Sequence, residues 1–265
     1  MSDLSDACCV CCDTPLERLR YFPRQLLCAD DMQAEQAYFR EKLRRHNRYL
    51  HGWGVVCGCD VQPLTGVAGW QVRVCPGYAV GPQGDEILID TCVDVDLQLG
   101  TSQPPCTTRW PCPPTGEMPS NVGKDAVVFI AVRYAECQSR PVAVHPAGCG
   151  CDESGCEYSR VRDSFEVKVL WELPDTHKQA ILADYAWCTT LKNAPPAEQE
   201  RLHLFPTPDC PPCPADPWVV LAAVRIPAQG STDANGNAAA LTVSTAARRV
   251  LLATQRLQVA LACQP

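Results

Sequence analysis

The sequence lacks the residue patterns that most catalytic proteins carry. It contains no Gly-x-Ser-x-Gly elbow, no Walker loop, no dinucleotide-binding glycine fingerprint and no His-Glu-x-x-His, which removes the common motif-based mechanisms from consideration. Histidine is also scarce and scattered, at His46, His51, His145, His177 and His203. The sequence therefore predicts no catalytic residue and no cofactor-binding residue, and we expect a protein that is not an enzyme.

Positive charge in excess and long apolar runs are missing as well. The chain has 23 Lys and Arg against 30 Asp and Glu, a formal net charge of -7, whereas polyanion binding depends on clustered basic side chains. No stretch approaches the roughly 20 apolar residues that a membrane helix needs. The first residues lack the basic and apolar regions of a secretory signal. We therefore expect no nucleic-acid partner, no membrane span and synthesis in the cytoplasm.

Cysteine, in contrast, is abundant. The 265 residues include 19 cysteines, an odd number that leaves at least one thiol without a disulfide partner inside the monomer. Disulfides are rare in reducing compartments, where such a count more often indicates metal binding. One hypothesis reconciles disulfides with cytoplasmic synthesis: the protein folds in the cytoplasm and meets an oxidising exterior only after it is released from the cell.

Two groups of cysteines have a spacing that could hold a zinc ion. Cys149, Cys151 and Cys156 lie within eight residues, and Cys210 and Cys213 are separated by two prolines. A tetrahedral zinc site would form if the two loops meet. A redox pair at Cys210 and Cys213 is disfavoured, because such pairs sit at helix N-termini and prolines follow here. Zinc ligation, structural disulfides and free thiols remain three open alternatives, and zinc is the only cofactor that the sequence indicates.

The chain divides by composition and periodicity into four parts. A cysteine-rich arm covers 1–30, an amphipathic helix 31–52, a β core 53–245 and a C-terminal helix 246–265. Asp30 and Asp31 are the candidate N-cap residues of the first helix. A stripe repeats along that helix with alternating spacings of four and three residues, which places its members on one face. We expect the stripe to pack inward; it consists of Met32, Gln36, Phe39, Leu43, His46 and Leu50.

A second face of the same helix carries arginines one turn apart. These are Arg40, Arg44 and Arg48. They either pair with carboxylates of the acidic body, as solvated charges commonly do, or form a phosphate-binding ridge. We retain both interpretations and treat the three arginines as candidate partner-binding residues.

Apolar and polar residues alternate through much of the β core. The run from Cys92 to Leu99 is apolar on odd numbers and polar on even ones, the pattern of a half-buried antiparallel strand. Val55, Cys57, Cys59 and Val61 are predicted to share one face of an earlier strand. Trp218 to Ile226 is almost unbroken in apolar character and is expected in the middle of a sheet.

Helices and proline-rich loops complete the predicted fold. A short helix is expected around His177 to Leu191, and residues from Ala247 to Leu261 recur at helical spacing in the C-terminal part. Pro- and Cys-rich loops are expected at 100–124, 137–160 and 195–217. The fold class is therefore mainly β (α+β), an antiparallel sandwich or barrel-like core with an N-terminal helix and a C-terminal helix.

One block is more specific than these patterns. It comprises Arg20-Tyr21-Phe22, Leu26-Leu27, Asp31, Glu35-Gln36-x-Tyr38, Lys42, Arg45-His46-Asn47-Arg48, Leu50-His51-Gly52-Trp53-Gly54-Val55-Val56-Cys57-Gly58, Val74-x-Pro76-Gly77-x-Ala79, Gly84 and Glu86-Ile87. The block, over the first third of the chain, resembles the front of a family of bacterial proteins that begin with a clustered-cysteine arm. That family is associated with phage-tail-like contractile injection systems.

The resemblance implies a structural or attachment component of such a particle, in a baseplate, cap or fibre-associated position. Its partners would be other subunits of a large assembly, it would be oligomeric, and it would become extracellular after release of the particle. The helix would attach the sheet to the particle through Arg40, Arg44 and Arg48. The alternative is a zinc-binding or disulfide-stapled module that recognises a protein or glycan surface, for which Trp70 and Trp110 are the candidate exposed aromatic residues.

Overall fold

The computed structural model places the helices and strands in the part of the chain between 15 and 257. The described residues are 15–64, 70–97, 126–144, 155–193, 195, 210, 214–228 and 240–257. The helical elements are α1 (Ala29–His46), the π-helical turn η2 (Asn47–His51) and α2 (Asp175–Asn193). The strands are β1 (Gly54–Gly58), β2 (Val61–Pro63), β3 (Gln71–Val74), β4 (Gly77–Val80), β5 (Glu86–Ile89), β6 (Val93–Asp96), β7 (Ala126–Val144), β8 (Gly155–Leu170), β9 (Val219–Ile226) and β10 (Thr242–Ser244).

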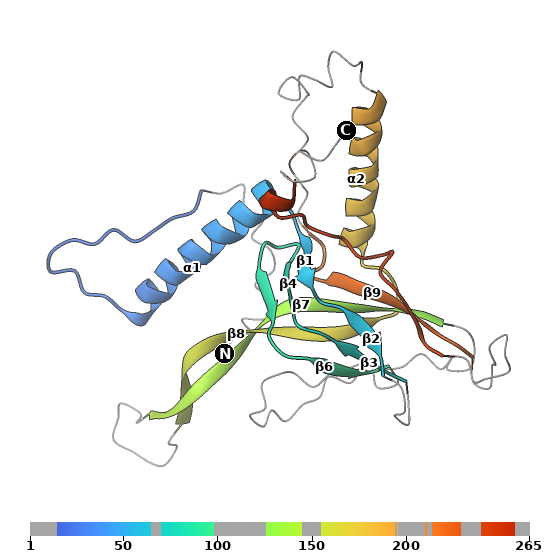
Figure 1. Ribbon diagram of the computed structural model, residues 1–265. Coiled ribbons are helices and arrows are strands. Elements are labelled where there is room, and N and C mark those ends of the chain that lie inside the picture. Colours follow the sequence, from blue (N-terminus) through green and yellow to red (C-terminus); the bar gives the residue numbers. More distant parts are fainter. Residues whose placement is uncertain are drawn as a thin grey trace.

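Within the described ranges, the strands pair into three antiparallel sheets. Their orders are β1-β4-β5, β2-β3-β6 and β10-β9-β7-β8. Figure 1 shows the two smaller sheets lying against the larger one, with α1 and α2 leaving this β body in different directions. The fold is α+β, with most of its regular residues in strands, as the sequence predicted.

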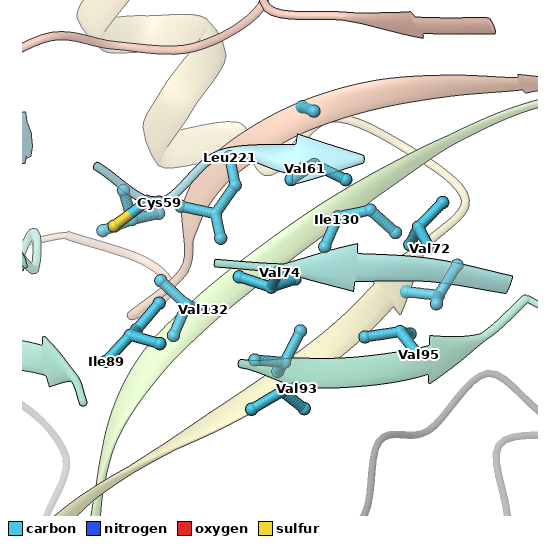
Figure 2. Packing of buried hydrophobic residues seen from close by; sticks show 14 of the residues in the cluster. Cys59, Val61, Val72, Val74, Ile89, Val93, Val95, Ile130, Val132 and Leu221 are labelled. Carbon is cyan, nitrogen blue, oxygen red and sulfur yellow. The ribbon is translucent and has the colours of Figure 1, made fainter. Parts of the chain in front are cut away.

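The core lies between the larger sheet and the smaller ones. Alternating residues of β3 and β6, among them Val72, Val74 and Val95, are fully buried, and Ile130 of β7 and Leu221 of β9 are buried with them. Figure 2 shows these side chains gathered in one cluster. Burying an aliphatic side chain of this size contributes roughly 1.5–3 kcal/mol, so this cluster is the main stabilising feature of the β body.

Two strand predictions are confirmed. Val93, Val95 and Leu97 are buried while Asp94 is exposed, which is the predicted alternation. β9 lies between β10 and β7 in the larger sheet, as its continuous apolar character required.

The predicted loop 137–160 is wrong over its described residues. Residues 137–144 belong to β7 and residues 155–160 to β8, and the two strands pair from Phe129 with Leu170 out to Val144 with Gly155. The outer half of this hairpin extends beyond the body (Figure 1). The described side chains from Cys137 outward are exposed or half-buried. Because neither face of the hairpin is covered there, its residues are mostly polar, and this composition led to the prediction of a loop.

The prediction of a C-terminal helix is also wrong over residues 246–253. Val250 forms a parallel bridge with Val55 of β1, and the amide of Leu251 donates to the carbonyl oxygen of Val55 at 2.9 Å. These backbone groups are therefore used in pairing with β1, which prevents helical hydrogen bonding. Helical residues begin at 254 and continue to 257, where the described part ends.

Among the residues that the structure describes, no helix is both long and apolar enough to cross a membrane.

Candidate interaction surface

Helix α1 begins two residues before its predicted start. The N-cap is Cys28, and its amide donates to Oδ2 of Asp31 at 3.0 Å. This backbone hydrogen bond lowers the pKa of Asp31, because it stabilises the carboxylate form. Asp31 therefore occupies the third helical position and not the cap, and its charge lies at the helix end where a carboxylate is favourable.

The C-terminal end of α1 is attached to the turn between β4 and β5. The guanidinium Nε of Arg44 is 2.5 Å from Oδ1 of Asp85, and its Nη1 is 2.5 Å from Oε1 of Glu41. The side-chain amide of Asn47 donates to the carbonyl oxygen of Gly84 at 2.9 Å. These contacts come from one side of the helix and hold its last turn on the body.

Burial acts on both members of the Arg44–Asp85 pair. Desolvation raises the pKa of Asp85, and the neighbouring Arg44 offsets part of that rise. Desolvation alone would lower the pKa of Arg44, but Asp85 and Glu41 together raise it. The guanidinium thus stays charged, and it is the partner that allows a carboxylate at this depth.

The three candidate arginines have different surroundings. Arg40 pairs with Glu136 of β7 at 2.7 Å in an exposed position, where such pairs contribute about 0–1 kcal/mol. Arg44 is engaged with Asp85. The guanidinium of Arg48 lies over the ring of Tyr49, 4.8 Å from its centroid. Pairing with body carboxylates, the first of the two interpretations, thus applies to Arg40 and Arg44, and charge reversal at Arg44 would disturb the fold.

The inward-facing stripe of α1 is a wrong prediction. All six of its members, Met32, Gln36, Phe39, Leu43, His46 and Leu50, are exposed. Phe39 retains 59% and Leu43 50% of their accessible surface. The described contacts of α1 with the body come from its C-terminal half, at Arg40 and Arg44, on a neighbouring side. The helix projects from the body (Figure 1), and its apolar stripe is exposed.

Helix α2 exposes a second apolar surface, which the sequence patterns did not indicate. Its first turn is attached to the body: the amide of Thr176 donates to Oδ2 of Asp216 at 3.2 Å, and the amide of Asp216 donates to Oγ1 of Thr176 at 3.1 Å. Beyond this turn the helix projects from the body (Figure 1), and Asp184 in its middle pairs with Arg249 at 3.0 Å. Leu182 and Tyr185 retain 68% and 74% of their accessible surface. A signal was present in the apolar residues of the predicted helix, but their exposure depends on tertiary packing.

His177 of α2 is the most buried titratable side chain at this junction. Its ring is fully buried, packs edge-on against Trp53 with centroids 5.3 Å apart, and contacts the carbonyl oxygen of Ala247 through Nε2 at 2.6 Å. Nε2 therefore carries the proton, and no described residue forms a hydrogen bond with the buried Nδ1. Burial lowers the pKa of His177, since an imidazolium would lose its hydration.

We expect acidification to weaken the fold through His177. Its folded-state pKa is below the unfolded value of about 6.5, so the unfolded chain binds the proton first. The contribution is fully present above that pH and is lost as the pH falls towards the folded-state pKa. Urea unfolding between pH 7.5 and 5 measures this slope. In His177→Gln the slope is expected to be shallower.

The matched control for that measurement is His51→Gln, which removes an exposed histidine. It is expected to keep the wild-type slope. An equal slope in His177→Gln and wild type would show that His177 does not titrate differently in the two states.

The predicted metal ligands are mostly beyond the described part of the chain. Cys149, Cys151 and Cys213 lie outside the described residues, as does the side chain of Cys156. Cys210 is described and is an exposed free thiol. Among the described residues, no group of three or more His, Cys, Asp or Glu side chains could hold a metal ion. The zinc and disulfide hypotheses for this set therefore stay predictions.

Two cysteines expected on one strand face are separated. Cys59 is buried, and burial raises the pKa of its thiol to about 11, so it behaves as a small apolar side chain. Cys57 is exposed. The register of β1 against β4 shifts between Val55 and Cys57, and this irregularity turns Cys57 outward.

The candidate glycan-binding aromatic residues are not brought together. Trp70 is half-buried and packs against the core, while Trp110 lies outside the described residues.

Comparisons with known proteins do not assign a function, so any inference about function depends on the chain's own residues. No family model matches the sequence, and no curated protein matches it either. The resemblance in the first third of the chain thus remains an expectation. The features available for inferring function are the two projecting helices and their exposed apolar side chains.

Proposed function

We propose that the protein is a non-enzymatic structural or attachment component of a large protein assembly. The observation that carries the proposal is the pair of helices projecting from the β body with apolar side chains uncovered (Figure 1). Contiguous exposed apolar surface of this kind marks interaction sites in folded proteins. A rigid antiparallel body with helices that dock on neighbours suits a part whose task is to hold other subunits in place.

The particle itself is proposed from the sequence resemblance. The block from Arg20 to Ile87 supports a component of a phage-tail-like contractile injection particle, in a baseplate, cap or fibre-associated position. The block spans α1 and includes Asn47 and Gly84, whose hydrogen bond attaches the helix end to the β4–β5 turn. Two of the residues that carry the resemblance thus help to position the projecting helix. Its partners would be other protein subunits.

The proposal is tested by the size of the native protein in a host lysate. We expect an antibody against the chain to detect it co-sedimenting with a very large particle. Recovery of the protein only as a free monomer or small oligomer would contradict the assembly role.

A variant of α2 tests whether the exposed face of this helix attaches the protein to the particle. In Leu182→Gln/Tyr185→Gln, incorporation into the particle is expected to fall at least about tenfold, because interface anchors of this size each contribute about 1–2 kcal/mol or more. Both side chains are exposed, so the free energy of unfolding should change by less than about 1 kcal/mol. Particle-bound and free protein are quantified after sedimentation.

The matched control is Thr190→Ala, which at about 100° per residue lies about 80° from Leu182 and about 140° from Tyr185 around the same helix. It is expected to be incorporated as well as the wild type. Undiminished incorporation of the double variant would remove α2 from the proposed attachment surface.

A further inference from the structure

The exposed stripe of α1 has the spacing of a coiled-coil seam. From Met32 to His46 its members alternate spacings of four and three residues, a seven-residue repeat by which two helices keep their apolar faces in contact. Leu50 continues the spacing but lies in the π-helical turn η2. A helix that only borders its own body has no need of this spacing on its solvent side. The stripe is uncovered along its whole length, so a second helix can lie on it without displacing any described contact.

Charge is separated along α1. Its N-terminal half carries Asp30, Asp31 and Glu35, and its C-terminal half carries Arg40, Lys42, Arg44 and Arg45 together with one carboxylate, Glu41, which pairs with Arg44 of the same helix. The halves are complementary to each other, so the helix matches an identical helix that runs in the opposite direction. In a parallel pair the two acidic N-terminal halves would lie side by side and so would the two basic C-terminal halves, and Glu35 would face only one basic residue of the second copy, Arg40.

We propose that α1 pairs with α1 of a second copy of this chain, in an antiparallel arrangement along the exposed stripe. In the register that centres the pair, Met32 lies against Leu43 of the second copy and Gln36 against Phe39 of the second copy, and symmetry repeats both contacts. The inference rests on the proposed function in one respect: it names the chain itself as one of the partners in the assembly.

The same register brings one charged pair together twice. Glu35 and Lys42 flank the stripe on the same side, one heptad apart. In antiparallel helices such positions face each other, so Glu35 lies opposite Lys42 of the second copy and the reverse pair forms by symmetry. Glu35 already accepts a hydrogen bond from the hydroxyl of Tyr21, which leaves its other carboxylate oxygen for the lysine.

The attachment of α1 leaves room for a second helix. Arg44 and Asn47 contact the body from one side of the stripe, and Tyr21 contacts Glu35 on the other. The helix of 18 residues is about 27 Å long, and its described contacts with the body lie in its C-terminal half, from Arg40 onward. An antiparallel pair therefore places the two bodies at opposite ends of the helices, where they do not compete for space.

The interface is small, so the dimer is expected to be weak and concentration-dependent. Four mixed layers between two helices fall at the low end of specific interfaces, below about 1,200 Å². Many copies held in one particle would make such a contact effective.

The experiment measures self-association of the purified full chain by sedimentation velocity under reducing conditions, from about 1 to 100 µM. E35K and K42E each turn two attractive contacts into repulsive ones, so each is expected to weaken the dimer about tenfold. An equimolar mixture of E35K and K42E forms a heterodimer with both pairs complementary, and the double variant E35K/K42E restores the homodimer. Both are expected to return to wild-type affinity.

Two further variants separate the interface from the fold. Phe39→Gln/Leu43→Gln removes apolar surface that is exposed in the monomer, and we expect at least about a hundredfold loss of association with little change in stability. Tyr21→Phe removes the hydrogen bond to Glu35 without changing charge and is expected to dimerise as the wild type does.

Three results would overturn the inference. They are a wild-type protein that stays monomeric throughout this range, single charge variants that associate as the wild type does, and weakening by E35K without weakening by K42E. The last result would indicate a parallel pair, in which Glu35 faces Arg40 of the second copy and Lys42 faces Asn47. Failure of self-association with continued incorporation into a particle would remove this inference alone, whereas a dimer that never enters a particle would remove the assembly role alone.

Discussion

Replacement of Arg248 by alanine is expected to lower the free energy of unfolding by about 3–5 kcal/mol, because it removes the hydrogen-bond donors of two buried carbonyl oxygens. Nε of Arg248 donates to the carbonyl oxygen of Leu221 and Nη2 to that of Cys59, both at 2.7 Å. Nη1 lies 3.6 Å from Asp60. The side chain retains only 11% of its accessible surface, so water cannot fully replace the guanidinium.

The position of these carbonyls explains the size of the effect. Leu221 lies where the pairing of β9 with β7 shifts register, and Cys59 follows β1 with a φ of 56°. Irregularities of this kind leave backbone groups outside the sheet ladder, and Arg248 supplies the missing donors. One side chain thereby connects β1, β9 and the segment after β10.

Urea unfolding at neutral pH measures this prediction. Arg256→Ala removes the same charge from an exposed position and is expected to change the free energy of unfolding by less than about 0.5 kcal/mol. Arg248→Lys should recover only part of the loss, because one ammonium cannot reproduce the guanidinium fork. A loss below about 1 kcal/mol in Arg248→Ala would mean that other groups satisfy both carbonyls.

Replacement of Gly84 by alanine is expected to lower the free energy of unfolding by about 2–4 kcal/mol and to release the end of α1. Gly84 has a φ of 92°, and an added Cβ would lie 2.1 Å from the carbonyl oxygen of Arg44. The helix end must therefore move. Its movement disrupts the hydrogen bond from Asn47 to Gly84 and the ion pair between Arg44 and Asp85, which leaves a buried carboxylate without its partner.

Gly81→Ala is the matched control in the same turn. An added Cβ at Gly81 would be 3.6 Å from its nearest neighbours, an ordinary contact distance, so a change of less than about 0.5 kcal/mol is expected. Urea unfolding gives both values, and limited trypsin digestion reports whether Lys42 and neighbouring arginines become more accessible. Equal stability and equal digestion of the two variants would show that the body does not hold α1 through this turn.

Strand alternation was predictable because it is local. Val93, Val95 and Leu97 are buried in the order that their spacing predicts, since a half-buried strand needs apolar residues at every second position. The same rule failed at Cys57, where the pairing of β1 with β4 shifts register. That shift depends on a distant strand and leaves no periodic signal in β1.

The sequence pattern of α1, the candidate interaction helix, was also informative only about local structure. Periodicity predicted one helical face for the stripe, and its members from Met32 to His46 lie on α1 while Leu50 lies in the π-helical turn η2. Periodicity carries no information on whether the body covers that face. Two of the three candidate arginines have carboxylate partners in distant segments, Asp85 and Glu136. The spacing of these arginines revealed a charged face, whereas their partners depend on how the sheets and α1 come together.

By itself the sequence determined the α+β class, the N-terminal and mid-chain helices and the buried alternation of the core strands. The reason is that the spacing of apolar residues differs between a helix and a half-buried strand. Only the tertiary structure decided that the stripe from Met32 to Leu50 faces solvent. It also decided that residues 246–253 pair with β1 instead of forming a helix. Both outcomes depend on contacts between residues far apart in the chain, where backbone pairing and burial outweigh local propensity.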